Sequence, residues 1–204
     1  MNDLSNSLAQ EQLVWLPELG VGWYPVKESP YDDAYWQNYR QMDATPVGTV
    51  LTARRVDWAR RWGANAARTV DVGIGGGRFC VEFGCKGWDI NPHALEWLLS
   101  SGRALDPSLR KVDTATFWDS LEHIHDPRPI LANVERCVLV SMPIYRNVAH
   151  ILGSKHFKKD EHCWYFSAEG LTRFMERHGF TLAGWNTMEQ PEREDIETFA
   201  FMRH

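Results

Sequence analysis

Val70-Asp71-Val72-Gly73-Ile74-Gly75-Gly76-Gly77-Arg78-Phe79 is the stretch of sequence that decides the fold of this chain. It predicts a short buried strand, a glycine-rich turn and the first turn of a helix. Because glycine lacks a Cβ and tolerates positive φ, Gly73, Gly75 and Gly77 allow a ligand to lie against the backbone. The free N–H groups at the start of the helix point into the same space. The stretch therefore predicts a ligand-binding crevice at the end of the strand.

A second expected strand ends in an acid, Asp89, which can accept hydrogen bonds from a ribose diol in that crevice. The dinucleotide fingerprint Gly-x-Gly-x-x-Gly requires a third glycine. Read from Gly73, that position is Arg78; read from Gly75, it is Cys80, so the fingerprint fails. An ordinary strand–helix turn is the simpler alternative, but Asp89 favours a nucleoside site.

The pattern that remains, Asp71-x-Gly73-x-Gly75-x-Gly77, resembles motif I of the class I S-adenosylmethionine-dependent methyltransferases. The resemblance implies S-adenosyl-L-methionine as the cofactor, with Asp71 near its amino-acid end and Asp89 on its ribose hydroxyls. Asp106 follows a weak third strand and is a candidate for the acid at the adenine edge. A turn residue before Pro107 is an equal alternative for Asp106.

Composition limits the class of protein. A chain of 204 residues with 44% hydrophobic and 24% charged residues suits one globular domain with a modest appendage. A net charge of −5 argues against a protein that coats nucleic acid by charge alone. The four cysteines form no Cys-x-x-Cys pair, and no signal peptide or membrane-spanning run is visible. We therefore expect a cytoplasmic protein without a membrane partner.

The chain divides into an N-terminal extension, residues 1–49, and a methyltransferase domain, residues 50–204, with an insert loop at 144–163. The extension is rich in aromatic residues and looks irregular, apart from one helical turn at 35–39. These rings either pack the segment onto the domain or form a lid over the cofactor, and the resemblance favours the lid. A helix at 50–63 carries arginines that suit a solvated face better than a nucleic-acid patch: Arg54, Arg55, Arg60 and Arg61.

Strands and helices alternate through the domain, which predicts a doubly wound, Rossmann-like α/β sheet. The expected strands are 69–73, 86–90, 103–105, 112–118 and 137–142, and the expected helices are 77–84, 92–101 and 127–135. A helix at 168–178 and strands at 180–185 and 198–202 follow. The resemblance implies that these last two strands form an antiparallel hairpin at the edge of the sheet.

A second motif, Leu121-Glu122-His123-Ile124 with Asp126-Pro127, follows the fourth strand. Together with a later His162 and Phe166-Ser167, it resembles the branch of ubiquinone-biosynthesis O-methyltransferases. The interval between Asp89 and Asp119 is shorter than that family usually carries, which weakens the assignment of Asp106.

Methyl transfer from a sulfonium is a direct displacement, so positioning and desolvation supply most of the acceleration. A hydroxyl acceptor also needs a base. His123, His162 and Asp119 are candidate catalytic residues, because imidazole titrates near neutral pH and all three are expected at the crevice.

A metal site is the alternative for this cluster. Asp119, Glu122 and His123 have helical spacing, and with His162 they resemble the metal ligands of the small-RNA 3′-terminal 2′-O-methyltransferases. A metal would lower the pKa of a ribose hydroxyl. Glu-His pairs also occur in members without metal, where Glu caps the backbone and His orients substrate, so our expectation is an enzyme without metal.

The insert loop is locally basic in an acidic chain. We expect its cations to bind an anionic acceptor such as a phosphate, a nucleotide sugar or an RNA end, although a solvated loop is an equal alternative. These candidate substrate-binding residues are Arg146, Lys155, Lys158 and Lys159. The predicted function is O- or N-methylation of a small hydroxylated or anionic acceptor. An RNA-terminal methyltransferase and an inactive cofactor-binding module are the alternatives, and the oligomeric state stays open.

Overall fold

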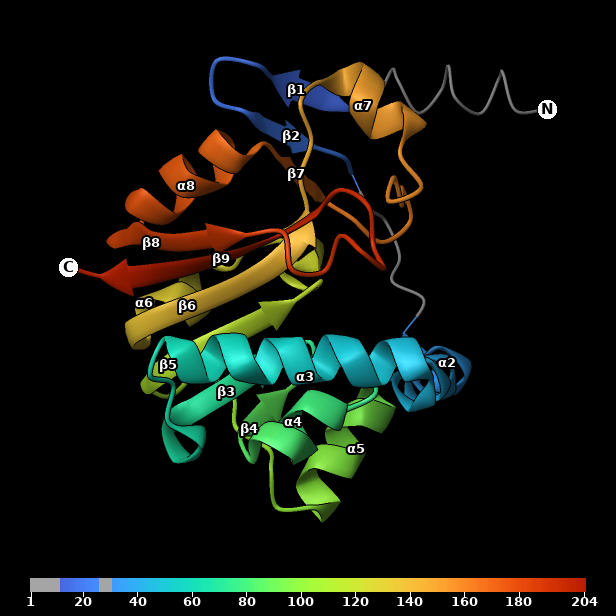
Figure 1. Ribbon diagram of the computed structural model, residues 1–204, viewed down its shortest axis with the longest axis vertical. Helices are drawn as coiled ribbons and strands as arrows, with labels where there is room; N and C mark the ends of the chain where they lie inside the picture. Colours follow the sequence, from blue (N-terminus) through green and yellow to red (C-terminus); the bar gives the residue numbers. More distant parts are fainter. Residues whose placement is uncertain (1–11, 26–30) are drawn as a thin grey trace.

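A six-stranded sheet lies at the centre of the computed structural model, which describes residues 12–25 and 31–204 (Figure 1). Its strand order is β4-β3-β5-β6-β9-β8. β3, β4, β5 and β6 run parallel, whereas β9 is antiparallel to both of its neighbours. The strands are β3 (Thr69–Val72), β4 (Lys86–Trp88), β5 (Val112–Trp118), β6 (Val134–Pro143), β8 (Phe180–Asn186) and β9 (Ile196–Arg203). The predicted doubly wound sheet with a C-terminal antiparallel hairpin is confirmed.

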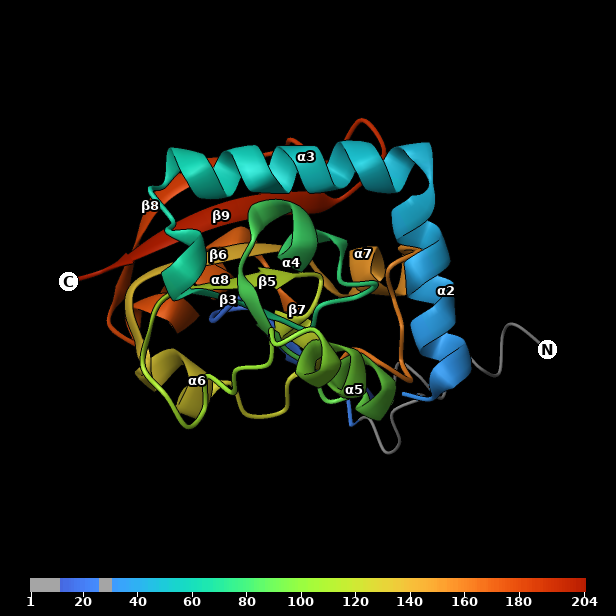
Figure 2. The ribbon, with the colours of Figure 1, turned by 90° about the horizontal axis from the view of Figure 1, so that it is seen from below.

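Helices cover both faces of this sheet. α3 (Pro46–Arg61), α4 (Arg78–Phe83) and α5 (Pro92–Ser100) pack on one face, and Figure 2 shows α4 and α5 in front of the strands. α6 (Arg128–Ala132) and α8 (Ala168–Glu176) pack on the other. Successive strand residues face opposite sides, so Val138 and Val140 belong to one core and Cys137 and Leu139 to the other.

The N-terminal segment is more helical than expected. α2 (Asp33–Ala44) replaces the single predicted turn, and α3 begins at Pro46 rather than near residue 50. The Asp32 carboxylate accepts a hydrogen bond from the Tyr35 N–H at 2.8 Å and caps α2. Thr45 caps α3 in the same way through the Gly48 N–H at 3.0 Å, with proline in the favoured first position. Pro46 therefore starts a second helix directly after the first one ends at Ala44.

A second, three-stranded sheet was not predicted. It consists of β1 (Val14–Leu16), β2 (Val21–Trp23) and β7 (Trp164–Phe166), and it joins the N-terminal segment to the residues that directly follow the insert loop. The insert loop also contains a short helix, α7 (Val148–Gly153). Strands of three residues are too short for a period-two pattern, and pairing such as Gly22 with Tyr165 is not local. The aromatic extension thus forms regular structure at 14–16 and 21–23, while residues 1–11 and 26–30 lie outside the described part.

The weak third strand near 103–105 is reduced to one isolated bridge, between Gly87 and Ala104. Within residues 12–25 and 31–204, no helix combines the length and apolar character that crossing a bilayer requires.

Candidate functional site

The glycine turn follows β3 in the conformation that its sequence predicts. Gly73, Gly75 and Gly77 have φ values of 72°, 55° and 86°. A Cβ on Gly73 would lie 2.5 Å from Cβ of Ser120, so the turn is also too crowded for a larger residue. A Cβ on Gly77 would lie 2.8 Å from the Trp97 ring. Gly77 therefore serves the packing of α4, while Gly73 and Gly75 line the cavities described below.

Two adjoining cavities lie at the carboxyl ends of β3, β4 and β5, where ligands bind in open α/β sheets. The smaller, about 240 Å³, contains Asp89. The larger, about 440 Å³, contains Asp71 and Arg55. The residues that line both cavities are Tyr39, Gly73, Gly75, Trp118, Asp119 and His123.

Asp89 links two backbone segments beside the smaller cavity. Its Oδ2 accepts a hydrogen bond from the Ile74 N–H at 2.9 Å, and its Oδ1 accepts one from the Asn91 N–H at 2.8 Å. Each carboxylate oxygen keeps a further lone pair for a ribose hydroxyl. Burial raises the pKa of Asp89, partly offset by these N–H donors. The residue thus fixes the glycine turn and faces the cavity at once.

Asp71 lies beneath the larger cavity. The Thr116 hydroxyl donates to its carboxylate at 2.6 Å, and the Cys80 thiol lies at 3.7 Å. Burial raises the pKa of Asp71 to about 7, and the Thr116 hydrogen bond and Arg55 only partly offset this effect. Asp71 is therefore a poorly solvated acid beneath the larger cavity.

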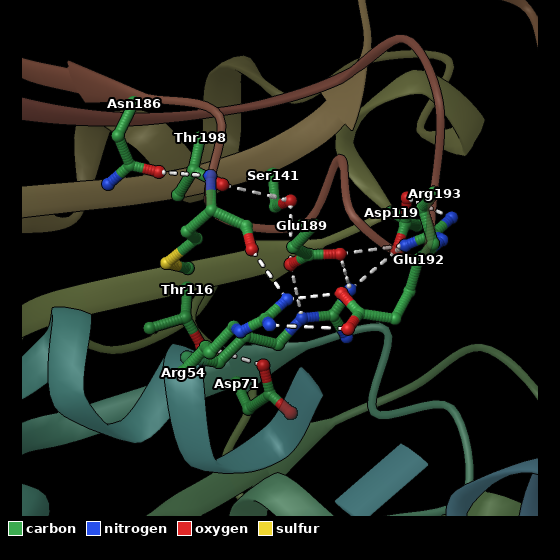
Figure 3. A network of polar contacts seen from close by, with 12 residues as sticks. Arg54, Asp71, Thr116, Asp119, Ser141, Asn186, Glu189, Glu192, Arg193 and Thr198 are labelled. Atoms are coloured by element: carbon green, nitrogen blue, oxygen red, sulfur yellow. Dashed lines mark hydrogen bonds and ion pairs between the residues drawn. The ribbon is translucent and has the colours of Figure 1, made fainter. Parts of the chain in front are cut away.

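Asp119 is bound by two arginines from distant segments (Figure 3). Arg55 on α3 donates to Oδ2 at 2.8 Å, and Arg193, in the loop between β8 and β9, donates to both carboxylate oxygens. Burial raises the pKa of Asp119, but Arg193 and Arg55 together outweigh burial and hold the pKa below its usual range. Asp119 is therefore a permanently charged structural partner, unsuited to act as a base.

The expected helical face shared by Asp119, Glu122 and His123 is wrong. Asp119 has a φ of 56° and precedes a short 3₁₀ turn, η2 (Leu121–His123). This left-handed residue directs its carboxylate to the arginines and away from the turn. The structure brings together only the other members of the predicted metal set, namely Glu122, His123 and His162, whose ligand atoms lie within 4.8 Å of one another.

Glu189 is a site residue that sequence reasoning missed. Its buried carboxylate accepts from Arg55 Nε at 2.7 Å, from Ser141 Oγ at 2.9 Å and from Arg193 at 3.0 Å. Arg54 also reaches this loop, through Glu192 and through the Met188 carbonyl at 2.7 Å. The predicted solvated face is therefore wrong for Arg54 and Arg55.

The only sequence signal for this loop is the i, i+4 spacing of Glu189 and Arg193, which suits an ion pair on a helical turn. The spacing does not reveal Arg55 as the partner, because Arg55 lies on another element.

Glu122 and His162 form the most buried polar pair of the larger cavity, with exposures of 1% and 3%. His162 Nε2 lies 4.0 Å from Glu122 Oε1, and the His123 and His162 rings meet edge to face at 4.5 Å. Among the described residues, neither Glu122 oxygen nor His162 Nδ1 has a hydrogen-bond partner. Burial of unsatisfied polar atoms costs stability, so this cluster is built for a ligand, ion or water.

Burial also controls protonation in this cluster. It raises the pKa of Glu122 to about 8, with Asp119 as the next cause, and it lowers the pKa of His123 to about 4. Burial likewise lowers the pKa of His162 well below its ordinary value. Both imidazoles are therefore neutral at neutral pH and keep a lone pair available.

The basic residues of the insert loop separate into two groups. Lys158 lines the larger cavity, where its ammonium lies 3.7 Å from Glu161, and His156 and Arg193 line the same cavity. Arg146, Lys155 and Lys159 are exposed and line neither cavity. Only Lys158 among the four predicted cations faces the expected ligand space.

Asp106 also lies away from both cavities. Its carboxylate accepts from the Ser108 N–H at 2.8 Å and from the Ser108 hydroxyl at 2.6 Å. This geometry favours the turn alternative over the adenine-edge alternative for Asp106.

Comparison with known proteins agrees with this geometry. Residues 50–183 match the family described as "Methyltransferase domain". The chain belongs to this family. It is an S-adenosylmethionine-dependent methyltransferase. No curated protein matches the sequence.

Solved methyltransferases share the fold of this one. Magnesium protoporphyrin IX methyltransferase from Synechocystis with bound S-adenosylhomocysteine superposes with a TM-score of 0.62 at 12% identity, over 85% of this chain and 96% of that one. A possible histamine N-methyltransferase from Thermotoga maritima has a TM-score of 0.59 at 14% identity, over 84% and 97%. A Burkholderia thailandensis 1,6-didemethyltoxoflavin-N1-methyltransferase has a TM-score of 0.54 at 14% identity, over 94% and 99%. At these identities the likeness concerns the fold.

Proposed function

We propose that this methyltransferase methylates an oxygen or nitrogen of a small anionic acceptor that occupies the larger cavity beside His123. The observation that carries the proposal is the position of His123, which lines both cavities. The donor extends through the smaller cavity and over the glycine turn, so the transferred methyl group lies where the cavities meet. The acceptor then approaches from the side of Lys158, His156 and Arg193.

His123 is the proposed general base. Burial keeps its imidazole neutral at working pH but also makes it a weak base, so its position at both cavities, rather than its pKa, supports proton transfer from a hydroxyl acceptor as the methyl group moves. His162, whose ring meets that of His123, would orient the base and the acceptor. Asp119 is left out of this role because two arginines hold its carboxylate.

The acceptor-side charges support an anionic substrate. Lys158 lines the larger cavity, and its ammonium suits a carboxylate or phosphate, whereas Arg193 is already paired with Asp119 and Glu189. The Leu-Glu-His motif supports a finer proposal, that the enzyme is related in function to the ubiquinone-biosynthesis O-methyltransferases. Nucleic acid is a less favoured acceptor, since two of the four arginines on α3 bind the acidic loop 187–195.

We also propose that the part of the N-terminal extension from Tyr31 to Ala44 acts as a lid on the domain formed by residues 50–204; residues 1–11 and 26–30 of the extension lie outside the described part. Tyr31, Tyr35, Trp36 and Tyr39 line the smaller cavity, and the Asn91 side chain donates to the Asp32 carbonyl at 3.1 Å. The insert loop 144–163 closes the larger cavity from the other side through Lys158 and His162.

The base is tested with His123→Gln. We expect binding of S-adenosylmethionine, measured by calorimetry, to stay within a few-fold, while kcat on an acceptor panel falls about 10²- to 10⁴-fold. An unchanged kcat on every accepted hydroxyl substrate would remove His123 from the mechanism. Cofactor binding without turnover on any acceptor would favour a binding module.

A metal-dependent enzyme is the second candidate, favoured by the unsatisfied oxygens of Glu122 and the unsatisfied Nδ1 of His162. Glu122, His123 and His162 offer one carboxylate and two imidazoles, a donor set that suits a divalent transition metal. A cation there would lower the pKa of an acceptor hydroxyl. Metal analysis of the purified protein and of Glu122→Gln, with activity before and after chelation, tests this candidate. A fully active enzyme without metal would overturn it.

A further inference from the structure

The position of the donor sulfur follows from the two cavities, given the cofactor placement proposed above. S-adenosylmethionine is one chain in which the sulfur joins the ribose to the amino-acid part. Asp89 faces the smaller cavity, and Asp71 lies at the larger one. The positively charged sulfur therefore lies where the cavities meet, beside the residues that line both.

Two of those shared residues are aromatic, Tyr39 and Trp118. An aromatic face attracts a cation within about 6 Å of its centre. The Trp118 ring already has the Arg55 guanidinium 5.5 Å from its centroid. Since that cation occupies the ring and would repel another positive charge, Trp118 is the weaker partner for a sulfonium.

Tyr39 is placed directly over the glycine turn. A Cβ on Gly75 would lie 3.4 Å from Cδ1 of Tyr39, so the ring lies beside the turn with room for little more than a methyl group between them. Tyr35 lies against Tyr39, with ring centroids 4.8 Å apart and planes tilted by 36°. Tyr35, from the same helix α2, thus packs against the Tyr39 ring, which borders both cavities.

A polar chain fixes this ring. The hydroxyls of Tyr35 and Tyr39 lie 3.2 Å apart, and the Tyr35 hydroxyl lies 3.1 Å from the carboxylate of Glu161. Tyr31 packs edge-on against Tyr35 at 5.3 Å. Helix α2 and the insert loop therefore hold Tyr39 between them, with an acid behind the aromatic cluster.

We propose that Tyr39 recognises the positive charge of the methyl donor and so distinguishes S-adenosylmethionine from the product S-adenosylhomocysteine. The sulfur carries a positive charge as a sulfonium and becomes a neutral thioether once the methyl group has moved to the acceptor. The attraction between sulfur and ring is lost in that step. Tyr39 thus favours binding of the donor and departure of the product, independently of which acceptor the enzyme uses.

Calorimetry with three ligands tests this role: S-adenosylmethionine, S-adenosylhomocysteine and sinefungin, which carries an ammonium in place of the sulfonium methyl. We expect Tyr39→Leu to weaken both charged ligands about five- to thirtyfold, the range of a desolvated cation–π contact. The affinity for S-adenosylhomocysteine should change less than about twofold. Its binding also shows that the variant is folded. Tyr39→Met, which keeps most of the volume, serves if the leucine variant is unstable.

Two conservative variants complete the experiment. Tyr39→Phe keeps the ring, and Tyr35→Phe removes only the supporting hydroxyl, so both should keep the wild-type ratio of donor to product affinity. The proposal would be overturned if Tyr39→Leu weakened the binding of all three ligands equally. It would also be overturned if Tyr39→Phe lost the wild-type ratio of donor to product affinity. Failure of the acceptor assignment leaves these affinities unaffected, whereas absence of donor binding in the wild type would refute the cofactor placement itself.

Discussion

Arg193 forms a two-pronged ion pair with Asp119, a residue that lies 74 positions earlier in the chain, at the end of β5. The same guanidinium reaches Glu189 at 3.0 Å, and Arg55 bridges the same two acids from α3. Two arginines and two carboxylates thus neutralise one another beside the larger cavity.

Arg193→Ala should lower the free energy of unfolding by about 1–3 kcal/mol, because it leaves Asp119 and the buried Glu189 with Arg55 alone. Arg60→Ala is the matched control, since the Arg60–Asp57 pair is 65% and 79% exposed. Urea unfolding measures both. If Arg193→Ala lowers the free energy of unfolding no more than Arg60→Ala does, the network adds no stability.

Asp89 and Asp106 should differ sharply in cofactor binding. Asp89→Ala removes a carboxylate that faces the smaller cavity and fixes the glycine turn, so we expect the affinity for S-adenosylmethionine to fall about 10- to 100-fold. Asp106→Ala should leave that affinity unchanged, because Asp106 binds Ser108 in a turn. Calorimetry decides, and a comparable loss in Asp106→Ala would restore the adenine-edge role.

Lys158 is the cation of the insert loop that should matter for the acceptor. Lys158→Glu places a negative charge in the larger cavity, and we expect the acceptor KM to rise about tenfold, equivalent to about 1.4 kcal/mol. Lys155→Glu and Lys159→Glu make the same charge change at exposed positions outside it and should leave KM unchanged. An equal rise in the acceptor KM for all three variants would indicate long-range attraction between the loop and the acceptor rather than a contact with Lys158.

The buried acid Asp71 predicts a pH dependence of stability. Its pKa of about 7 in the folded protein exceeds the unfolded value of 3.8, so the folded state holds an extra proton between these values. This contribution to the free energy of unfolding is complete below the lower value and is lost as pH rises through the upper one.

Asp71→Asn cannot ionise, so it should gain stability relative to wild type as pH rises from about 5 to about 8. Urea unfolding at several pH values measures the difference. Asp57→Asn, the same change at an exposed position, is the matched control. A constant difference for Asp71→Asn would mean that Asp71 titrates normally.

The sequence was sufficient to predict the strands of the large sheet that carry the site. Val70–Val72 and 137–142 are continuously apolar or buried. The glycines of the turn are explained by the positive φ values that the backbone adopts there. Asp89 followed from its place at the end of the next strand. Local composition and the alternation of strands and helices therefore predict the half of the site that we assign to the cofactor.

The acceptor half depends on contacts that local pattern does not encode. From the sequence, Arg55 looked like part of a solvated helix face. In the structure it binds Glu189, which lies 134 residues later in the chain. Residue spacing alone did not exclude Asp119 as a base. Its left-handed backbone, which turns the carboxylate toward the arginines, cannot be predicted from that spacing. The short strand β2 likewise pairs with β7, an element distant in sequence, and β1 joins the sheet through β2.

The separation of Arg55 from Glu189 has a consequence for the order in which the protein assembles. During synthesis, the glycine turn and α3 leave the ribosome long before loop 187–195 exists, and contacts of high sequence separation form late in folding. Until that loop has been made, Arg55 and Asp119 have only each other as partners in this network, because Glu189 and Arg193 both belong to the loop. A nascent chain ending before residue 187 would therefore contain the complete glycine turn but only half of the ion-pair network beside the larger cavity.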